Sequence, residues 1–244
     1  MNLSTSIVNS IQCTLKAIYR YGERTHGLKK LDFNVIKFSQ KSKTKEPLTL
    51  EKEMIIWQYC LNNKERISLA MSLGLYAGLR IGEICALKWE GIDLDNSMIS
   101  ITKTVQRLKS ENHEHKTQLY ILEPKSTSSI RSVILPDFLT EYLKKYNDLY
   151  NKDFFILSNK EIPVDPRIIQ KNFRKICKAN DIDATFHTLR HTYATNCIKT
   201  NIDVKTLSET LGHANVNITL NRYVHTSLDF KKQQINKIEP PIKP

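Results

Sequence analysis

Hydrophobic residues recur at helical spacing along most of the chain, in runs separated by polar breaks. The first run carries Ile7, Ile11, Leu15 and Ile18 three or four positions apart, with basic residues on the other faces. This pattern predicts an amphipathic helix. Similar runs predict helices over residues 49 to about 61, 67 to 77, 80 to 87, 136 to 150 and 165 to 178, with two more between 187 and 212. A short helix is also expected at residues 228–238, before the closing prolines.

Residues that favour helix ends stand at the ends of these runs. Thr49 and Asp203 are placed to cap the helices that follow them, and Asp165 precedes Pro166, which suits a first helical turn. Gly212 directly follows Leu211 and predicts the end of a helix there. His213 is therefore expected at a helix terminus, pointing out of the core.

The pattern changes to short β-type runs between residues 92 and 135. These runs cover residues 98–102, 119–122 and 131–135, and the composition of 123–129 predicts a hairpin connection between the last two. The sequence as a whole predicts a mainly α fold with a small antiparallel β-sheet.

A polar, charged stretch that ends in a proline, residues 41–47, divides the chain. Such a composition is typical of a linker. Residues 1–46 hold too little apolar sequence to form a domain, so we expect them to be the end of a larger domain plus the linker. Residues 47–244 are long enough to bury a core of their own.

The charge balance indicates a polyanionic partner. The 244-residue chain carries 37 Lys and Arg against 25 Asp and Glu, a net charge of +12, and clustered cations bind phosphate backbones. No apolar run approaches the roughly 20 residues that span a bilayer, and no signal peptide opens the sequence. The five cysteines are scattered and odd in number, which argues against disulfides and a cysteine metal site. We therefore expect a cytoplasmic, nucleoid-associated protein with no membrane partner.

One predicted helix combines an apolar face with a cationic one. Its apolar face is formed by Ile169, Phe173, Ile176 and Cys177. Its other face carries Lys171, Arg174, Lys175 and Lys178. An ordinary solvated face fits this pattern, but in so basic a chain it is also the best candidate to lie along DNA.

Residues suited to phosphate chemistry gather between positions 187 and 223. His187 and Arg190 are three apart, so on a helix their side chains share a face; His213 and Tyr223 follow. A guanidinium bridges phosphate oxygens, an imidazole moves a proton, and a phenol can form a covalent ester. Taken singly, each has an ordinary interpretation as a surface, cap or packing residue.

Two further motifs lie upstream. Arg80 and Glu83 are three apart on a predicted short helix, so the carboxylate is placed to orient the guanidinium; an ordinary surface ion pair is the alternative. Lys125 lies in the loop between two predicted strands, where an ammonium can reach a phosphate or remain solvated.

Taken in order, these motifs resemble the signature of the tyrosine recombinases, the phage-integrase family. The resemblance rests on the segments 77–83, 124–126, 187–191, 211–213 and 223–225 and covers roughly residues 47 to 230. It implies the DNA breaking-rejoining fold, with residues 47–244 as catalytic domain with a tail helix and residues 1–46 as the remnant of a core-binding domain. The implied site places five residues around the nucleophile Tyr223: Arg80, Lys125, His187, Arg190 and His213.

The resemblance also implies how these groups would act. Tyr223 would attack a phosphodiester and store the bond as a 3′-phosphotyrosine, while Arg80 and Arg190 neutralise the non-bridging oxygens. Lys125 would protonate the leaving 5′-oxygen, His187 would assist proton transfer at the tyrosine, and His213 would hydrogen-bond the scissile phosphate. The arginines supply the charge that a divalent ion would otherwise provide, so neither a metal nor a cofactor is expected.

The implied function is site-specific recombination that integrates or excises a mobile element. Expected partners are double-stranded DNA, further copies in a homotetramer on two duplexes, and accessory DNA-bending factors; without DNA we expect a monomer. Residues 228–238 are the candidate for docking on a neighbouring copy. A non-catalytic DNA-binding regulator on the same fold and a type IB topoisomerase remain alternatives, and a metal-dependent nuclease is disfavoured for want of a carboxylate cluster.

Overall fold

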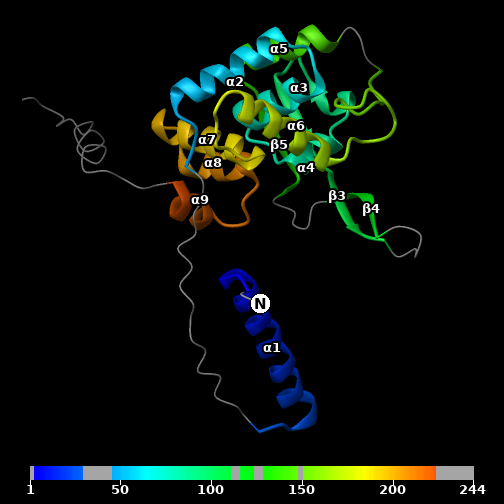
Figure 1. Cartoon of the computed structure of the whole chain (residues 1–244), viewed down its shortest axis with the longest axis vertical. Coiled ribbons are helices and arrows are strands. Elements are labelled where there is room, and N and C mark those ends of the chain that lie inside the picture. Colours follow the sequence, from blue (N-terminus) through cyan, green and yellow to red (C-terminus); the bar gives the residue numbers. More distant parts are fainter. Residues whose placement is uncertain (1–2, 30–45, 111–115, 124–128, 148–150, 224–244) are drawn as a thin grey trace, which may run out of the picture. The chain divides into compact units, whose positions relative to one another are not determined.

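The chain forms two compact units, residues 1–44 and residues 45–244 (Figure 1). The computed structural model describes residues 3–29, 46–110, 116–123, 129–147 and 151–223. In the first unit α1 (Thr5–His26) begins after Ser4, whose side chain accepts the Ile7 N–H, and ends at Gly27 in the left-handed conformation. The predicted first helix is confirmed, and the predicted tail helix at 228–238 lies outside the described residues.

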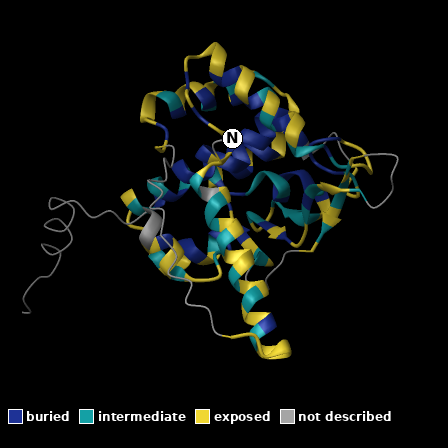
Figure 2. Cartoon of the chain, turned by 60° about the horizontal axis from the view of Figure 1, so that its bottom comes forward, coloured by how far each residue is buried: buried dark blue, intermediate teal, exposed yellow. Residues whose placement is uncertain are grey.

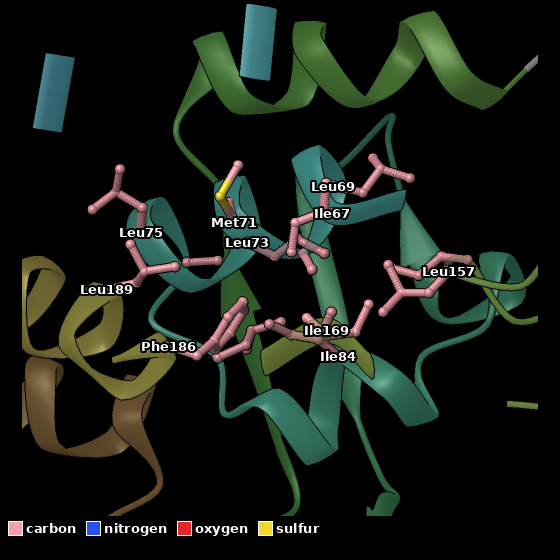
Figure 3. Packing of buried hydrophobic residues seen from close by; sticks show 14 of the residues in the cluster. Ile67, Leu69, Met71, Leu73, Leu75, Ile84, Leu157, Ile169, Phe186 and Leu189 are labelled. Carbon is pink, nitrogen blue, oxygen red and sulfur yellow. The ribbon is translucent and has the colours of Figure 1, made fainter. Parts of the chain in front are cut away.

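Helix α3 (Arg66–Tyr76) is the centre of the second unit. Every residue from Ile67 to Leu75 is buried, and a helix that is apolar on all sides has to be enclosed by other elements. The enclosing helices are α2 (Leu50–Asn62), α4 (Ile81–Ala86), α5 (Asp137–Asn147), α6 (Pro166–Ala179) and α7 (Phe186–Lys199). Figure 3 shows Met71 and Leu73 of α3 packed among side chains of this core, including Ile84 and Phe186.

The predicted helix ends are confirmed where the structure describes them. The Thr49 side chain accepts the Lys52 N–H, and Asp165 accepts the Arg167 N–H at 2.9 Å. Asp203 accepts the Thr206 N–H at 2.9 Å and so begins α8 (Val204–Leu211). Gly212 ends α8 at φ 61°, in the left-handed region that glycine adopts at little cost. The next helix, α9 (Val216–Tyr223), packs against α7 and α8.

The strands form two small antiparallel sheets and not the predicted hairpin. In the first sheet, β2 (Met98–Ile101) lies between β1 (Ile92–Asp93) and β5 (Arg131–Ile134). The second sheet pairs β3 (Thr104–Lys109) with β4 (Thr117–Leu122). Thus the predicted strands 119–122 and 131–135 belong to different sheets, and their predicted pairing is wrong.

The error has a physical reason. The run from Thr104 to Lys109 was overlooked as a strand, and once it is present it pairs with β4 over its whole length. β5 is then free to pair with β2, where Val133 lies opposite Ile99 and both are fully buried. Burial of that pair fixes the register of the first sheet.

Helix α6 has the two faces that the sequence predicts. Ile169, Phe173, Ile176 and Cys177 are buried, and Figure 2 shows buried and exposed residues alternating along the helices of this unit. Lys171, Arg174, Lys175 and Lys178 are exposed. None of the helices in the described part of the chain combines the length and apolarity that a membrane crossing requires.

Candidate active site

Arg80 stands at the N-terminal end of α4 and is held by Glu83. The Glu83 carboxylate accepts the Arg80 main-chain N–H through Oε2 and the guanidinium Nη1 through Oε1, both at 2.8 Å. Arg80 Nη2 donates to the Gly212 carbonyl at 3.2 Å. The predicted pair is therefore more than a surface ion pair, because Glu83 is almost fully buried and orients Arg80 towards the end of α8.

Close packing at α4 requires glycine at position 82. A Cβ built there would lie 2.6 Å from Thr104 Oγ1 and 2.8 Å from the Val105 carbonyl oxygen. The second of these atoms is main chain and cannot turn away. Gly82 therefore lets α4 lie directly on β3, which brings Arg80 to the wall of a cleft.

Arg190 is buried, with 2% of its surface exposed. Its Nη1 donates to the Gly78 carbonyl at 2.7 Å and its Nη2 to the Leu211 carbonyl at 2.6 Å. Gly78 has φ 64°, and a Cβ there would lie 2.4 Å from the Tyr193 ring, so only glycine allows this carbonyl to reach Arg190. These carbonyl oxygens orient the guanidinium, and because they carry only partial charges they do not cancel its positive charge as a carboxylate would.

His213 lies beside Arg190 and is half-buried. Its Nε2 is 3.2 Å from Arg190 Nη2, and its Nδ1 is 2.8 Å from Thr219 Oγ1 on α9. A guanidinium only donates hydrogen bonds, so Nε2 accepts here and the ring proton is assigned to Nδ1. His213 thus connects the end of α8 to the helix that ends in Tyr223.

The end of α8 is a meeting point for three arginines. The carbonyls of Thr210, Leu211 and Gly212 accept hydrogen bonds from Arg131 Nε, Arg190 Nη2 and Arg80 Nη2, respectively. The last carbonyls of a helix lack intrahelical partners and carry the negative end of its dipole. This terminus therefore stabilises a concentration of positive charge that would otherwise repel itself.

Arg131 and Thr219 were missed in the sequence. Arg131 is the first residue of β5, and its Nη1 and Nη2 each donate to the Glu83 carboxylate at 3.0 Å. A signal was present: alternate residues Arg131, Val133 and Leu135 share one strand face, and Val133 and Leu135 are buried. An arginine on a buried face requires an acceptor. Thr219 offers no comparable signal.

His187 is exposed at the start of α7 and lines a cleft of about 720 Å³ together with Arg80. Its ring makes an edge-on contact with that of His191, with centroids 5.9 Å apart. Arg107 of β3 and Asp165, the residue that precedes α6, also line the cleft and form an ion pair at 2.8 Å. The lining residues thus come from the segments around α4, β3, α6 and the start of α7.

The cationic face of α6 meets this cleft in part. Arg174 lines it, with Gln170 one turn and Arg167 two turns earlier, because positions 167, 170 and 174 fall on one side of a helix. Arg174 and Lys178 also line an adjoining hollow of about 550 Å³. Lys171 and Lys175 lie further round the helix. Arg167 and Gln170 are therefore additions to the predicted face.

Two predicted residues are placed only in part. Lys125 lies outside the described residues. The backbone of Tyr223 closes α9, but its side chain is likewise outside them. In the described part of the chain, then, Arg80, Glu83, Arg190 and His213 come together at the end of α8, and His187 lies on the cleft beside Arg80.

Comparison with known proteins identifies relatives across most of the second unit. The model of the phage integrase family matches residues 48–229. A XerC-like tyrosine recombinase of Caldanaerobacter subterraneus is 30% identical over 195 residues, covering 71% of this chain and 48% of that protein. The transposase A of transposon Tn554 from Staphylococcus aureus is 31% identical over 209 residues, covering 84% and 55%. The chain spans about half the length of these curated relatives.

Solved structures share the fold. The integrase of transposon Tn1549, in complex with a circular intermediate DNA, superimposes with a TM-score of 0.81 at 22% identity, covering 98% of this chain and 81% of that one. The XerA recombinase gives a TM-score of 0.60 at 23% identity, covering 90% and 72%. The predicted fold class, mainly helical with small antiparallel sheets, is confirmed.

Proposed function

The chain belongs to the phage integrase family, and from this premise we propose that it cleaves and rejoins DNA strands through a covalent 3′-phosphotyrosine on Tyr223. The observation that carries the proposal is the convergence of Arg80, Arg190 and His213 at the carbonyl end of α8. These groups come from three distant segments. Hydrophobic packing does not require two guanidinium groups and an imidazole, whereas a pentacoordinate phosphate is stabilised by them.

The roles follow from the geometry and from the chemistry of phosphoryl transfer. Arg80 and Arg190 neutralise the non-bridging oxygens as charge builds on phosphorus; donors of this kind contribute roughly 3 kcal/mol each. Both are oriented beforehand by carbonyls and Glu83, so little reorganisation is needed during the reaction. His187 assists proton transfer at the tyrosine, and Lys125 protonates the 5′-oxygen that leaves.

His213 hydrogen-bonds the scissile phosphate in this proposal. Nδ1 faces Thr219 Oγ1, and Nε2 faces Arg190 Nη2. Donation to a phosphate oxygen requires a proton on Nε2. The neutral tautomer with that proton can still accept a hydrogen bond from the Thr219 hydroxyl at Nδ1.

The proposed substrate is double-stranded DNA, with the reaction integrating or excising a mobile element. The exposed basic face of α6 and the cleft that Arg167, Gln170 and Arg174 line support a duplex running past His187. Relatives include the transposase A of transposon Tn554 and the ICEBs1 integrase of Bacillus subtilis, which supports the proposed action on a mobile element. Residues 47–244 are the proposed catalytic domain, residues 1–46 the end of a core-binding domain, and the working assembly a homotetramer on two duplexes.

The test is covalent capture. A pool of nicked suicide duplexes with randomised sequence is incubated with the chain in EDTA, and products are resolved on a denaturing gel beside those of Tyr223→Phe. The proposal expects a protein–DNA adduct that forms without metal and is absent from the variant. Equal DNA binding by both proteins, with no adduct from either on selected sites, would instead favour a DNA-binding regulator on this fold.

A further inference from the structure

We propose that Arg131 is a positioning residue for the phosphate-binding arginines, and that it acts by offsetting the negative charge of Glu83. This inference rests on the proposed function of the same site. Arg131 lies on β5, outside the motifs that define the site in the sequence. Its side chain is only 6% exposed, as is that of Glu83.

Glu83 accepts four hydrogen bonds from Arg80 and Arg131. Oε1 accepts from Nη1 of Arg80 at 2.8 Å and from Nη1 of Arg131 at 3.0 Å. Oε2 accepts from the Arg80 main-chain N–H at 2.8 Å and from Nη2 of Arg131 at 3.0 Å. A carboxylate has about four acceptor positions. All of them are therefore used, and half are satisfied by Arg131.

Arg131 also sets the net charge around Glu83. Glu83 orients Arg80, but one carboxylate beside one guanidinium leaves no net charge to attract a phosphate. A second guanidinium at the same carboxylate returns the cluster to one net positive charge. Arg131 itself is enclosed, whereas 37% of the Arg80 side chain is exposed. The net positive charge that Arg131 restores is therefore available to a phosphate at Arg80, the more exposed of the two arginines.

Arg131 also contacts the end of α8. Arg131 Nε donates to the Thr210 carbonyl at 2.6 Å, directly before the carbonyls that Arg190 and Arg80 hold. A Cβ on Gly212 would lie 3.0 Å from Arg131 Nη1, so the guanidinium lies against the turn that presents His213. One side chain therefore fixes both Glu83 and the end of α8. Displacement of a reacting group by about 1 Å can cost about 100-fold in rate.

The experiment compares Arg131→Met with the double variant Glu83→Gln/Arg131→Met in the full chain. Initial rates of adduct formation are measured at saturating suicide duplex, after circular dichroism confirms folding. Arg131→Met is expected to slow cleavage about 100-fold while duplex affinity changes less than threefold. Because removal of the Glu83 charge restores the balance, the double variant should be at least tenfold faster than Arg131→Met. Lys144→Met, an exposed lysine on α5, controls for loss of one positive charge.

The results distinguish a positioning role of Arg131 from a purely structural role and from failure of the proposed function. A purely structural Arg131 predicts a double variant no faster than Arg131→Met, and that outcome overturns the inference, as does a normal rate for Arg131→Met. If the unmodified chain forms no adduct, the proposed function fails and the inference is tested by NMR of the ring of His213. Arg131→Met should shift those resonances and Lys144→Met should not. Unshifted resonances contradict the positioning role.

Discussion

The end of α8 and the outer face of α6 carry the same kinds of side chain in opposite settings. At the end of α8, Arg190 and Arg131 are almost enclosed, and each donor that the structure records meets a carbonyl, a carboxylate or an imidazole. On α6, Lys171 and Lys175 project into solvent beside a buried apolar face. Burial and fixed partners give a cation one position, whereas exposure lets it move.

This difference separates two uses of positive charge. A solvated cation attracts a polyanion at long range, with affinity that salt screens. A buried cation that is oriented in advance stabilises charge at one point, and salt screens it much less. We therefore expect changes at the end of α8 to affect cleavage rate and folding, and changes on α6 to affect duplex affinity and its salt dependence.

The largest effect on cleavage is expected from Arg190→Lys. Lysine keeps the charge but cannot hold the carbonyls of Gly78 and Leu211 together, because its donors radiate from a single nitrogen. Cleavage should fall by about 100-fold to 1,000-fold, measured as the rate of adduct formation at saturating duplex. A loss below tenfold would mean that a positive charge at position 190 is enough for cleavage, and it would contradict the contrast between the end of α8 and the face of α6.

Glu83→Gln should give the next effect, on stability and on its pH dependence. Burial alone would raise the pKa of Glu83, but the hydrogen bonds and charges of Arg131 and Arg80 prevail and lower it. Breaking a buried pair from one side costs about 3 to 5 kcal/mol, which urea unfolding at neutral pH measures.

The sign of the pH dependence is fixed by the direction of that shift. With a lowered pKa in the folded state, the unfolded chain takes up its proton first as the pH falls, so Glu83 contributes its stability above the ordinary carboxyl value of about 4.3. The difference between the wild-type chain and Glu83→Gln should shrink as the pH drops below that value through the folded pKa. A difference that stays constant down to that range would contradict a charged Glu83.

A smaller loss is expected from Gly212→Ala. Position 212 has φ 61°, and the added Cβ would lie 3.0 to 3.2 Å from the Arg131 guanidinium, which is pinned by Glu83 and Thr210. The strain should cost about 1 to 3 kcal/mol in urea unfolding. A loss below about 1 kcal/mol would contradict close packing of Arg131 against this left-handed turn.

The smallest effects belong to α6. Arg174→Ala removes a cation that lines the cleft, so the slope of log affinity against log salt should fall by about 0.9, the value of one phosphate contact. Lys175→Ala, further round the helix, should change the slope less. Both variants should cleave at the normal rate once the duplex is saturating. A cleavage defect in either would extend the active site onto α6.

The features that could be predicted from the sequence are those that depend on nearby residues. Helix starts at Thr49, Asp165 and Asp203 and the stop at Gly212 depend on side chains within a few residues of the helix end, so they can be identified without a fold. The wrong strand pairing shows the opposite case, because β5 pairs with β2 across more than thirty residues. Nothing local distinguishes that partner from β4.

The candidate site shows the same limit. Arg80, His187, Arg190 and His213 were identified by motif, but Arg131 belongs to the cluster only through contacts with Glu83 and Thr210, which are distant in sequence. Thr219 lies beside His213 because α9 packs on α8. The catalytic roles of Arg80, Lys125, His187, Arg190, His213 and Tyr223 stay predictions.

The most direct measurement identifies the residue that carries the DNA and the end of the DNA strand that is attached to it. The captured adduct is digested with nuclease and protease, and the modified peptide is sequenced by tandem mass spectrometry, with the DNA strand labelled at its 5′ end. The account predicts that the adduct retains the 5′-label before digestion, and that after digestion a nucleotide is joined through its 3′-phosphate to the Tyr223 oxygen. Attachment to any other residue, or through a 5′-phosphate, would contradict it.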